Sequence, residues 1–457
     1  MLFNRFVILV LKYSQRNQRI NNFIQELYVS NTFRRILSGS FWNAILNLWG
    51  KGISFVGTVI IIRIIGREAF GEFGMLNTTV SMFGMFTSFS ISQTATKFIA
   101  EFRNSDKEKA GRIIGLSFLF SGFLGLLLFI SVFLFADILA AKSLNAPHLA
   151  NSIRLMALGL FFGSVNGAQN GIISGFESFK SNTLVNIFLT SFLTILKVVL
   201  AYLYGFNGAV IGMTVEPVLS YLTTFFLTKS IIKSNQIKTR FKGALKESRI
   251  FLSYSLPSLL VGLFVFPSNW FVMTLLAKSK GGYHDLGAFN AANQWFNVLI
   301  FIPYILVSTF LPVFSNLLAE NKLFAVDRII KNAVLIILML FIPMSLLFLF
   351  FGDSIAIKIY GSDFKGTGIL LAVAVFTMIP QGISIVLGNL LGALSKMWFS
   401  FWTNVVWCAV LIGATYLFLP MGAVGLLYAK LLSFSINFAL MFLFYLNWKS
   451  KINLIEK

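Results

Sequence analysis

The sequence predicts an all-α polytopic membrane protein with about 12 transmembrane helices in two six-helix lobes, which are related by a parallel internal repeat. Three observations support this fold class. The chain is 57% hydrophobic and only 12% charged, and its mean hydropathy is +0.82. Apolar stretches of about 20 residues, long enough to cross the hydrocarbon core of a bilayer, recur along almost the whole chain. A sequence pattern also recurs at a fixed offset in the two halves.

The predicted spans divide evenly between the two halves. In the first half they cover residues 41–64, 73–96, 113–136, 152–175, 182–204 and 208–228. In the second half they cover residues 251–277, 287–312, 330–351, 367–392, 397–418 and 422–447. Helices are expected here because a backbone inside lipid must satisfy its polar groups internally.

The segments outside the spans complete the predicted organisation. Residues 1–40 form a basic N-terminal segment that is cytoplasmic or interfacial, and residues 41–228 form the N-terminal six-helix lobe. A basic cytoplasmic linker, 229–250, leads to the C-terminal lobe, 251–448, and a cytoplasmic tail, 449–457.

The net charge of +21 is distributed unevenly across the predicted topology. Most Lys and Arg residues lie in the N-terminal segment, in the linker and in the loops on the same side. The positive-inside rule therefore places both termini in the cytoplasm. Basic residues at this surface indicate contact with anionic membrane lipids, and we expect no binding to nucleic acid.

The repeated pattern links the two halves at an offset of 216 residues. Phe70-Gly71-Glu72-Phe73, followed by Asn77, recurs as Leu286-Gly287-Ala288-Phe289, followed by Asn293. Each half contains an even number of predicted spans, so both halves run in the same direction across the membrane. Parallel internal repeats of this kind are typical of membrane transporters.

Four short motifs carry a resemblance to a known family. They are Arg63-Ile64-Ile65-Gly66, Phe70-Gly71-Glu72-Phe73, Thr96-Lys97-Phe98-Ile99-Ala100-Glu101 and Gly205-x2-Gly208-Ala209. In their order and spacing they resemble the Wzx-type oligosaccharide flippases that act in O-antigen and other polysaccharide pathways. These flippases belong to the multidrug/oligosaccharidyl-lipid/polysaccharide exporter superfamily. The resemblance covers about residues 40–447.

The resemblance implies a V-shaped pair of lobes that works by alternating access. The implied cargo is an undecaprenyl-pyrophosphate-linked oligosaccharide, moved from the cytoplasmic to the outer leaflet of the bacterial cytoplasmic (inner) membrane. Such a protein needs no cofactor, and a polysaccharide polymerase is a candidate partner; we expect a monomer. Lys97 stands where relatives often carry Arg, which keeps the charge but loses the planar, bidentate guanidinium.

Polar stripes run along several predicted helices. Their members recur every three or four residues, so they share one face of a helix. The candidate binding residues on these stripes are Asn43, Asn47, Asn77, Asn290, Asn293, Gln294 and Asn297. They either line a hydrated cavity that hydrogen-bonds sugar hydroxyls or tie neighbouring helices together.

Ionisable residues inside the predicted spans are costly and therefore informative. Lys51, near the middle of the first span, has no carboxylate at matching depth and is a candidate contact for the pyrophosphate. Arg63, at the outer end of that span, either receives the phosphates late in transport or extends to the interface. Lys97 is a third candidate phosphate contact.

Lys197 and Glu216 lie at similar depth on adjacent antiparallel spans, because the turn between those spans is very short. They form either a structural ion pair or a site of proton coupling through Glu216. Lys430 corresponds to Glu216 in the second half, at an offset of 214 residues, and either faces the cavity or extends to the interface.

Prolines concentrate in the second half of the chain. The seventh span contains Pro257 and Pro267, and the eighth contains Pro303 and Pro312. Because proline removes a backbone hydrogen bond, these helices are predicted to be the bending elements of a gate, with static kinks as the alternative.

Enzyme chemistry has little support in the sequence. There is no Walker A loop, no grouping of residues with metal-ligand spacing, and no candidate catalytic residue; Cys408 lies within a predicted span and is expected to pack there. We therefore expect a transporter rather than an enzyme. The alternative to a flippase is a multidrug or cation antiporter of the same superfamily. Three deep lysines against one deep glutamate favour an anionic cargo.

Overall fold

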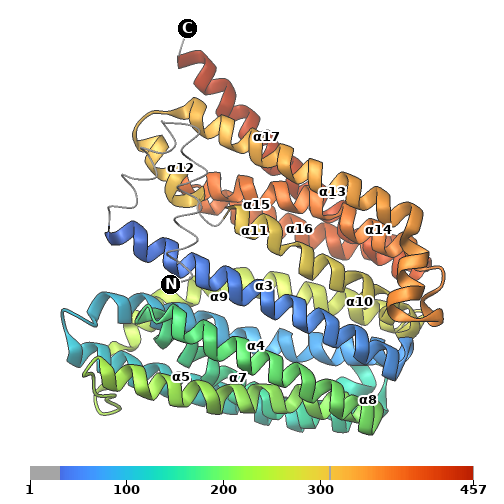
Figure 1. Ribbon diagram of the computed structural model, residues 1–457, viewed down its shortest axis with the longest axis horizontal. Coiled ribbons are helices and arrows are strands. Elements are labelled where there is room, and N and C mark those ends of the chain that lie inside the picture. Colours follow the sequence, from blue (N-terminus) through green and yellow to red (C-terminus); the bar gives the residue numbers. More distant parts are fainter. Residues whose placement is uncertain (1–30, 308–309, 456–457) are drawn as a thin grey trace.

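The computed structural model describes residues 31–307 and 310–455 of the chain. Within these residues the secondary structure is helical and contains no strand (Figure 1). Six helical segments are long and apolar enough to cross a membrane by length and composition alone. The all-α polytopic fold class predicted from the sequence is confirmed.

The N-terminal lobe is built from the helices up to Ser234. Its long helices are α3 (Asn31–Ile65), α4 (Arg67–Phe102), α5 (Lys107–Leu134), α7 (Ala150–Gly175) and α8 (Phe179–Ser234). Short turns between α5 and α7 are α6 (Ala136–Ile138), η1 (Leu139–Ser143) and η2 (Pro147–Leu149).

The C-terminal lobe follows after the short helix η3 (Ala244–Glu247). Its helices are α9 (Ser248–Ala277), α10 (Gly282–Leu299), α11 (Phe301–Val307), α12 (Phe310–Ala319), α13 (Leu323–Tyr360), α14 (Gly368–Phe376), α15 (Met378–Ala393), α16 (Met397–Phe418) and α17 (Gly422–Ile455). Two short turns, η4 (Ser362–Phe364) and η5 (Leu419–Met421), connect them.

Several helices extend beyond the predicted spans. α3 begins at Asn31, so residues 31–40 are helical and continuous with the first predicted span. α8 ends at Ser234 and η3 begins at Ala244, so both ends of the predicted linker, 229–250, are helical. Helix ends that carry charged residues continue past the hydrocarbon core into the polar interface, so hydropathy alone underestimates their length.

Two tight turns of matching geometry reverse the chain. Gly205 divides α8 into two antiparallel arms with φ 59° and ψ −135°, and Gly422 joins α16 to α17 with φ 61° and ψ −136°. A Cβ on Gly208 would lie 1.8 Å from the carbonyl oxygen of Leu200, and one on Gly425 would lie 1.9 Å from that of Phe418. Glycine is required at Gly205 and Gly422 by the positive φ, and at Gly208 and Gly425 by the lack of room for a Cβ. The two turns therefore correspond at an offset of 217 residues rather than the 214 inferred from sequence.

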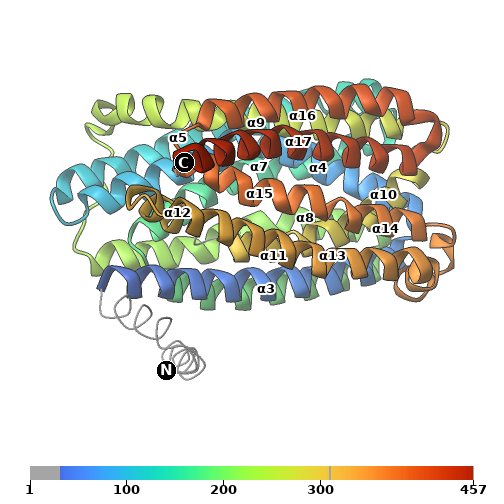
Figure 2. The same cartoon turned by 90° about the horizontal axis from the view of Figure 1, so that it is seen from above.

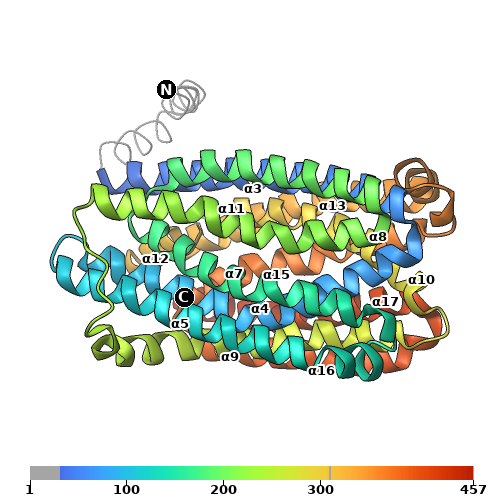
Figure 3. The same ribbon diagram turned by 90° about the horizontal axis from the view of Figure 1, so that it is seen from below.

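The two lobes lie side by side with their helices running along the long axis of the molecule (Figures 1 and 2). We call the end that contains the turns at Gly66, Gly205, Gly282 and Gly422 the junction end. The opposite end, where α3 begins and α17 ends, is the terminal end. The lobes converge at the junction end and diverge towards the terminal end (Figure 1). In the N-terminal lobe, α8 packs beside α3 (Figure 3).

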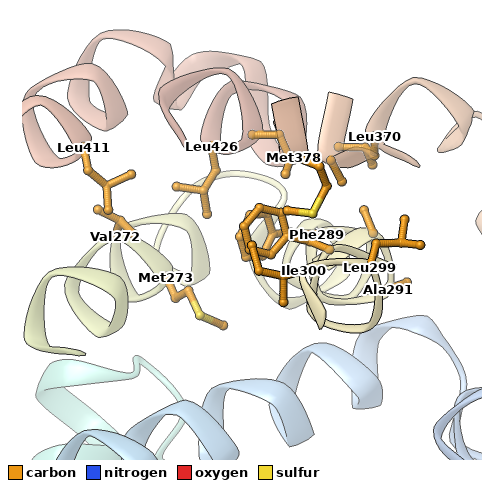
Figure 4. Close-up of a cluster of buried hydrophobic side chains, with 14 of the residues drawn as sticks. Val272, Met273, Phe289, Ala291, Leu299, Ile300, Leu370, Met378, Leu411 and Leu426 are labelled. Carbon is orange, nitrogen blue, oxygen red and sulfur yellow. The ribbon is translucent and has the colours of Figure 1, made fainter. Parts of the chain in front are cut away.

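The buried apolar core also differs between the two ends of the molecule. One continuous cluster includes Phe70 and Leu76 of α4 together with Leu286 and Phe289 of α10, so it crosses from lobe to lobe. Its C-terminal part packs side chains from α9, α10, α14, α15, α16 and α17 around Phe289 (Figure 4). A second cluster, around Ile113 and Ile172, lies within the N-terminal lobe towards the terminal end.

Helix breaks lie in the C-terminal lobe, but not everywhere that proline predicts. α9 is continuous through Pro257 and Pro267. A turn at Ile300 separates α10 from α11, three residues before Pro303, and a turn at Thr377 separates α14 from α15, three residues before Pro380. Neighbouring helices can satisfy the backbone groups that proline frees, so a proline in a membrane helix need not break it.

Candidate functional site

A cavity of about 550 Å³ lies on the N-terminal side of the interface between the lobes. Polar residues of α4 and α7 line it, including Asn77, Ser81 and Asn170. Glu216 of α8 adds a carboxylate, and Phe266 of α9 is the contribution from the other lobe.

Two further cavities, of about 230 and 430 Å³, lie on the C-terminal side. Both are lined by Asn269, Asn293 and Lys430. Ser81 and Phe266 line both the smaller of these cavities and the N-terminal cavity. The three cavities therefore adjoin one another and form a series that passes from one lobe to the other.

Lys430 is the cation inside the C-terminal cavities. Its side chain is 8% exposed; its Nζ donates a hydrogen bond of 2.6 Å to Oδ1 of Asn293 and lies 3.8 Å from the centroid of the Phe296 ring. Within the described residues Lys430 forms no salt bridge with a carboxylate. An amide oxygen and an aromatic face compensate part of the cost of burying the charge. Sequence reasoning named Lys430 but did not include it among the site residues.

The larger of the two C-terminal cavities combines side-chain amides with aromatic walls. Trp407, Phe296 and Phe434 form the aromatic part, with Trp407 and Phe434 ring centroids 5.3 Å apart. The indole Nε1 of Trp407 is buried and has no hydrogen-bond partner within the described residues. The lining amides are Asn269, Asn293, Asn297, Gln381, Asn404 and Asn437. Amides and aromatic faces around one cation suit a hydroxylated ligand with a negative charge.

Lys197 and Glu216 lie on facing arms of α8, and the structure brings them together. The Nζ of Lys197 is 2.8 Å from Oε2 of Glu216. Glu216 also lines the N-terminal cavity. The tight turn at Gly205 brings the two arms of α8 together, so that Gly212 packs against Lys197. Glu216 lies one helical turn beyond Gly212, within reach of the Lys197 side chain.

Lys51 lies at the seam between α3 and α10. Its Nζ donates a hydrogen bond of 2.9 Å to the backbone carbonyl of Asn297, in the last turn of α10, where helix carbonyls carry partial negative charge. Phe55 packs edge-on against Trp295 in the same seam, with ring centroids 4.9 Å apart. Lys51 does not line any of the three cavities, whereas its partner Asn297 lines the larger C-terminal cavity.

Arginines of the N-terminal lobe reach across the junction end. Arg63 donates from Nε to the carbonyl of Ile359 at 2.7 Å and also to the carbonyl of Lys358, both in the last turn of α13. Arg67 donates to the carbonyls of His284 and Asp363, each at 3.0 Å. The structure thus gives Arg63 protein partners, and it adds Arg67, which sequence reasoning missed.

The C-terminal lobe reaches back in the same region. Lys278 donates from Nζ to the carbonyl of Lys142 at 2.7 Å, and Tyr283 donates from its hydroxyl to the carbonyl of Leu144 at 2.7 Å. Burial, and then the nearby Glu72 carboxylate, raise the pKa of Tyr283, which keeps its hydroxyl protonated as a donor. We call Arg63, Arg67, Lys278 and Tyr283 the junction clasp.

Two glycines allow α4 and α10 to touch beneath the clasp. A Cβ on Gly71 would lie 2.0 Å from the carbonyl oxygen of Tyr283, and a Cβ on Gly287 would lie 2.0 Å from that of Arg67. The contacts are reciprocal, since Arg67 and Tyr283, like Gly71 and Gly287, are 216 residues apart. The repeated glycine of the sequence pattern is therefore a site of close backbone contact between the lobes.

The remaining predicted residues occupy different environments. Asn290 is 9% exposed and packs against Gly74, so it belongs to the α4–α10 contact. Asn47 and Lys97 are exposed, and Gln294 is half-buried. Asn43 lies in α3, but its side chain falls outside the described set. No group of three or more His, Cys, Asp or Glu side chains that could hold a metal ion occurs in the part of the chain searched.

Comparison with known proteins finds one family match and two relatives whose names refer to polysaccharide export and glycan biosynthesis. The family described as polysaccharide biosynthesis protein matches residues 36–318. The EPS I polysaccharide export inner membrane protein EpsE of Ralstonia solanacearum is 19% identical over 382 residues, which cover 81% of this chain and 84% of that protein. The probable low-salt glycan biosynthesis flippase Agl15 of Haloferax volcanii is 21% identical over 395 residues, covering 86% and 80% of the two chains.

Solved structures share the fold at low sequence identity. The lipid II flippase MurJ in an inward closed conformation aligns with a TM-score of 0.71 at 16% identity, covering 88% of this chain and 87% of that one. An inward-facing multidrug resistance MATE family transporter of the MOP superfamily aligns with a TM-score of 0.70 at 16% identity, covering 91% and 95%. Since the family match spans more than half of the sequence, this chain belongs to the polysaccharide biosynthesis protein family.

Proposed function

We propose that this protein is a flippase that translocates an undecaprenyl-pyrophosphate-linked oligosaccharide across the bacterial cytoplasmic membrane by alternating access. The observation that carries the proposal is the series of cavities, each with amide and charged side chains in its lining, between two lobes that meet at the junction end. A lipid-linked sugar requires a polar compartment for its head beside open lipid for its tail, and a pair of lobes that part at one end meets both needs.

The cargo chemistry suits the C-terminal cavity. Sugar hydroxyls would exchange hydrogen bonds with the amides and with Nε1 of Trp407 while their apolar faces lie against the aromatic walls. A phosphate oxygen would take the place of Asn293 beside Lys430. Lys51, which is held by the backbone of a cavity-lining residue, is the proposed contact for the pyrophosphate as it enters through the α3–α10 seam. Arg63 is the proposed contact for the phosphates late in transport, and Lys97 is a third proposed phosphate contact.

The proposed direction of transport follows from charge placement. The terminal end carries the basic linker, so we assign it, with both chain termini, to the cytoplasm. In this conformation the cavities would receive cargo from the cytoplasmic leaflet while the junction clasp keeps the outer end closed. Release on the outer side requires the clasp to break and the lobes to meet at the terminal end instead.

A multidrug or cation antiporter is the alternative within the same fold. A transported cation favours unpaired carboxylates, but Glu216 in the N-terminal cavity is already paired with Lys197. Lys430 adds positive charge to the other cavities. These features favour an anionic cargo. We further propose that the protein works as a monomer among membrane lipids and supplies a polysaccharide polymerase.

Deletion of the gene in the source organism tests this function. We expect loss of the surface polysaccharide and accumulation of its lipid-linked repeat unit on the cytoplasmic leaflet, both reversed by the wild-type gene. Unchanged polysaccharide together with new sensitivity to cationic drugs would support the antiporter and contradict the flippase.

A further inference from the structure

An apolar cavity of about 500 Å³ lies at the terminal end of the N-terminal lobe and shares no lining residue with the cavities between the lobes. Phe118 of α5, Val165 of α7, and Tyr221 and Phe225 of α8 form its walls. Phe241 of the linker completes it. The transport pathway proposed above does not use this space.

The linker is fixed over the cavity by contacts with α5. The backbone N–H of Arg240 donates to the carbonyl of Gly111 at 3.0 Å, and a Cβ on Gly115 would lie 2.2 Å from the carbonyl oxygen of Arg240. Two ion pairs add to this, since Arg240 lies 2.8 Å from Glu108 and Arg112 lies 2.9 Å from Glu247. The cavity is therefore bordered on one side by a segment that is held in place.

One buried hydroxyl in the cavity lacks a partner. Thr228 is 1% exposed and lines the cavity, yet its Oγ1 has no hydrogen bond within the described residues. By contrast, Thr214 and Thr223 of the same helix donate to the carbonyl four residues earlier. Buried polar groups without a partner are rare because they lose their bonds to water. The hydroxyl of Thr228 is therefore a candidate donor to a ligand oxygen in this cavity.

Positive charge and lipid-facing surface adjoin the same cavity. Lys229 and Lys233 line it and lie one helical turn apart, so both ammonium groups project from one face. Leu222 and Phe226, on the same arm of α8, are 43% and 69% exposed, as expected for side chains in contact with lipid. The cavity thus lies where acyl chains meet headgroups.

We propose that this cavity binds an anionic phospholipid. One acyl chain would occupy the space between Phe118 and Phe225, and an ester or phosphate oxygen would accept the hydrogen bond of Thr228. The phosphate would lie between Lys229 and Lys233. A free phosphate would leave the apolar volume empty, which distinguishes a lipid from a soluble anion.

Native mass spectrometry of the purified, full-length protein tests the proposal with phosphatidylglycerol and phosphatidylcholine as probes. We expect the wild-type protein to retain phosphatidylglycerol in preference to phosphatidylcholine. The double variant Lys229→Gln/Lys233→Gln should bind phosphatidylglycerol roughly 30-fold more weakly, since each lysine at an anionic lipid surface contributes about a factor of five. The matched control Lys242→Gln/Lys246→Gln removes two linker lysines outside the cavity and should bind like the wild type.

The variant Thr228→Val keeps the shape of the side chain and replaces the unpaired hydroxyl by a methyl group, so it should fold and bind phosphatidylglycerol more weakly. Equal losses in the two double variants would show general attraction to basic residues and would overturn the site. Equal retention of both lipids by the wild type, or displacement of phosphatidylglycerol by soluble glycerol phosphate, would overturn it as well. These binding results do not depend on whether the protein transports a sugar.

Discussion

Among the residues that the structure describes, Lys430 and Lys51 show two ways of stabilising a lysine ammonium group without a carboxylate partner. Lys430 is buried against Asn293 and Phe296 inside a cavity, whereas Lys51 caps the carbonyl of Asn297 near the end of α10. At Lys430, a ligand anion would replace one neutral amide oxygen and gain a charge-assisted hydrogen bond. At Lys51, a ligand anion would have to displace a carbonyl at the C-terminal end of α10, which the helix dipole already makes a favourable partner for a cation. Lys430 is therefore the stronger candidate for holding cargo.

Replacement of Lys430 by Gln is expected to reduce transport at least about tenfold, because a hydrogen bond to a charged group contributes roughly 1.5–3 kcal/mol. Protein abundance should not fall, since removal of a buried charge with no carboxylate partner relieves a desolvation cost. The measurement is the rate of lipid-linked sugar translocation per amount of membrane protein. Lys365→Gln, at an exposed loop lysine, is the control; normal transport in Lys430→Gln would remove Lys430 from the site.

The pair Lys197–Glu216 permits a charge-swap experiment. Either single reversal, Lys197→Glu or Glu216→Lys, replaces this ion pair of 2.8 Å by two like charges in a partly buried position and should lower protein level and transport. The double reversal should restore both if the pair is structural. Restored protein without restored transport would instead support proton coupling through Glu216, measured as the loss of pH dependence in the translocation rate.

The contacts of single residues could be predicted from the sequence where a short turn constrained them. The pairing of Lys197 with Glu216 followed from the short turn at Gly205, because a tight hairpin fixes which residues face one another. The environments of Lys51 and Lys430 did not follow, because the rotation of a helix about its axis is set by its neighbours. The offset of 214 residues between the halves also equated Lys430 with Glu216, whereas the matching turns pair Lys430 with Met213.

At the scale of elements, the crossing of α4 and α10 is the contact on which the junction end depends. Gly71 and Gly287 bring the two backbones together, and the clasp residues bond around them. The repeated pattern in the sequence identified both glycines, but only as a sign of duplication. Their role in joining the lobes became visible only when the two helices were placed in contact.

The variant Gly71→Ala is expected to disrupt this crossing, since the new Cβ would lie 2.0 Å from the carbonyl oxygen of Tyr283. That oxygen belongs to the backbone, so the clash cannot be relieved by a change of side-chain rotamer. Overpacking of this kind typically costs about 1–3 kcal/mol. Thermal unfolding in detergent should occur at a lower temperature, and the outer end should open more readily. Gly122→Ala, on α5 with no atom within 4 Å of the new Cβ, is the matched control; equal behaviour of the two variants would contradict the proposed contact.

The helix breaks show a second limit of sequence reasoning. Prolines predicted bending in the seventh and eighth spans, yet α9 is continuous while breaks occur at Ile300 and Thr377, each three residues before a proline. Proline removes one hydrogen bond wherever it stands, but the surrounding packing decides whether the helix parts. Composition predicts candidate kinks, and tertiary contacts select among them.

At the scale of the whole molecule, the lobes share a core and, at the junction end, a clasp. An alternating-access protein must exchange such contacts for others at the opposite end, so the clasp should set the balance between the two states. The fold class and the pairing of the lobes were accessible from hydropathy and the repeat. The conformation and the position of the cavities were not, because they depend on how the lobes pack.

Weakening of the clasp by Arg67→Ala should shift the population towards the outward-open state roughly tenfold or more, because two charged hydrogen bonds between the lobes are lost. A cysteine introduced at Ser81, in a Cys408→Ser background, reports this shift through labelling by a membrane-impermeant thiol reagent from outside. Arg154→Ala breaks an ion pair with Asp137 inside the N-terminal lobe and serves as the control. Labelling that does not rise in Arg67→Ala would mean that the clasp does not hold the closed end.

Transport by the purified protein is the most direct test of the flippase assignment. The protein is reconstituted into liposomes that carry a labelled undecaprenyl-pyrophosphate-linked oligosaccharide in both leaflets, and a glycosidase outside the liposomes removes the exposed sugar. Wild-type protein should make nearly all of the labelled sugar accessible, whereas protein-free liposomes should protect the inner half and the Lys430→Gln variant should expose that half at least about tenfold more slowly. Continued protection with folded wild-type protein, accompanied by ion-driven uptake of a cationic drug, would contradict the flippase and support the antiporter.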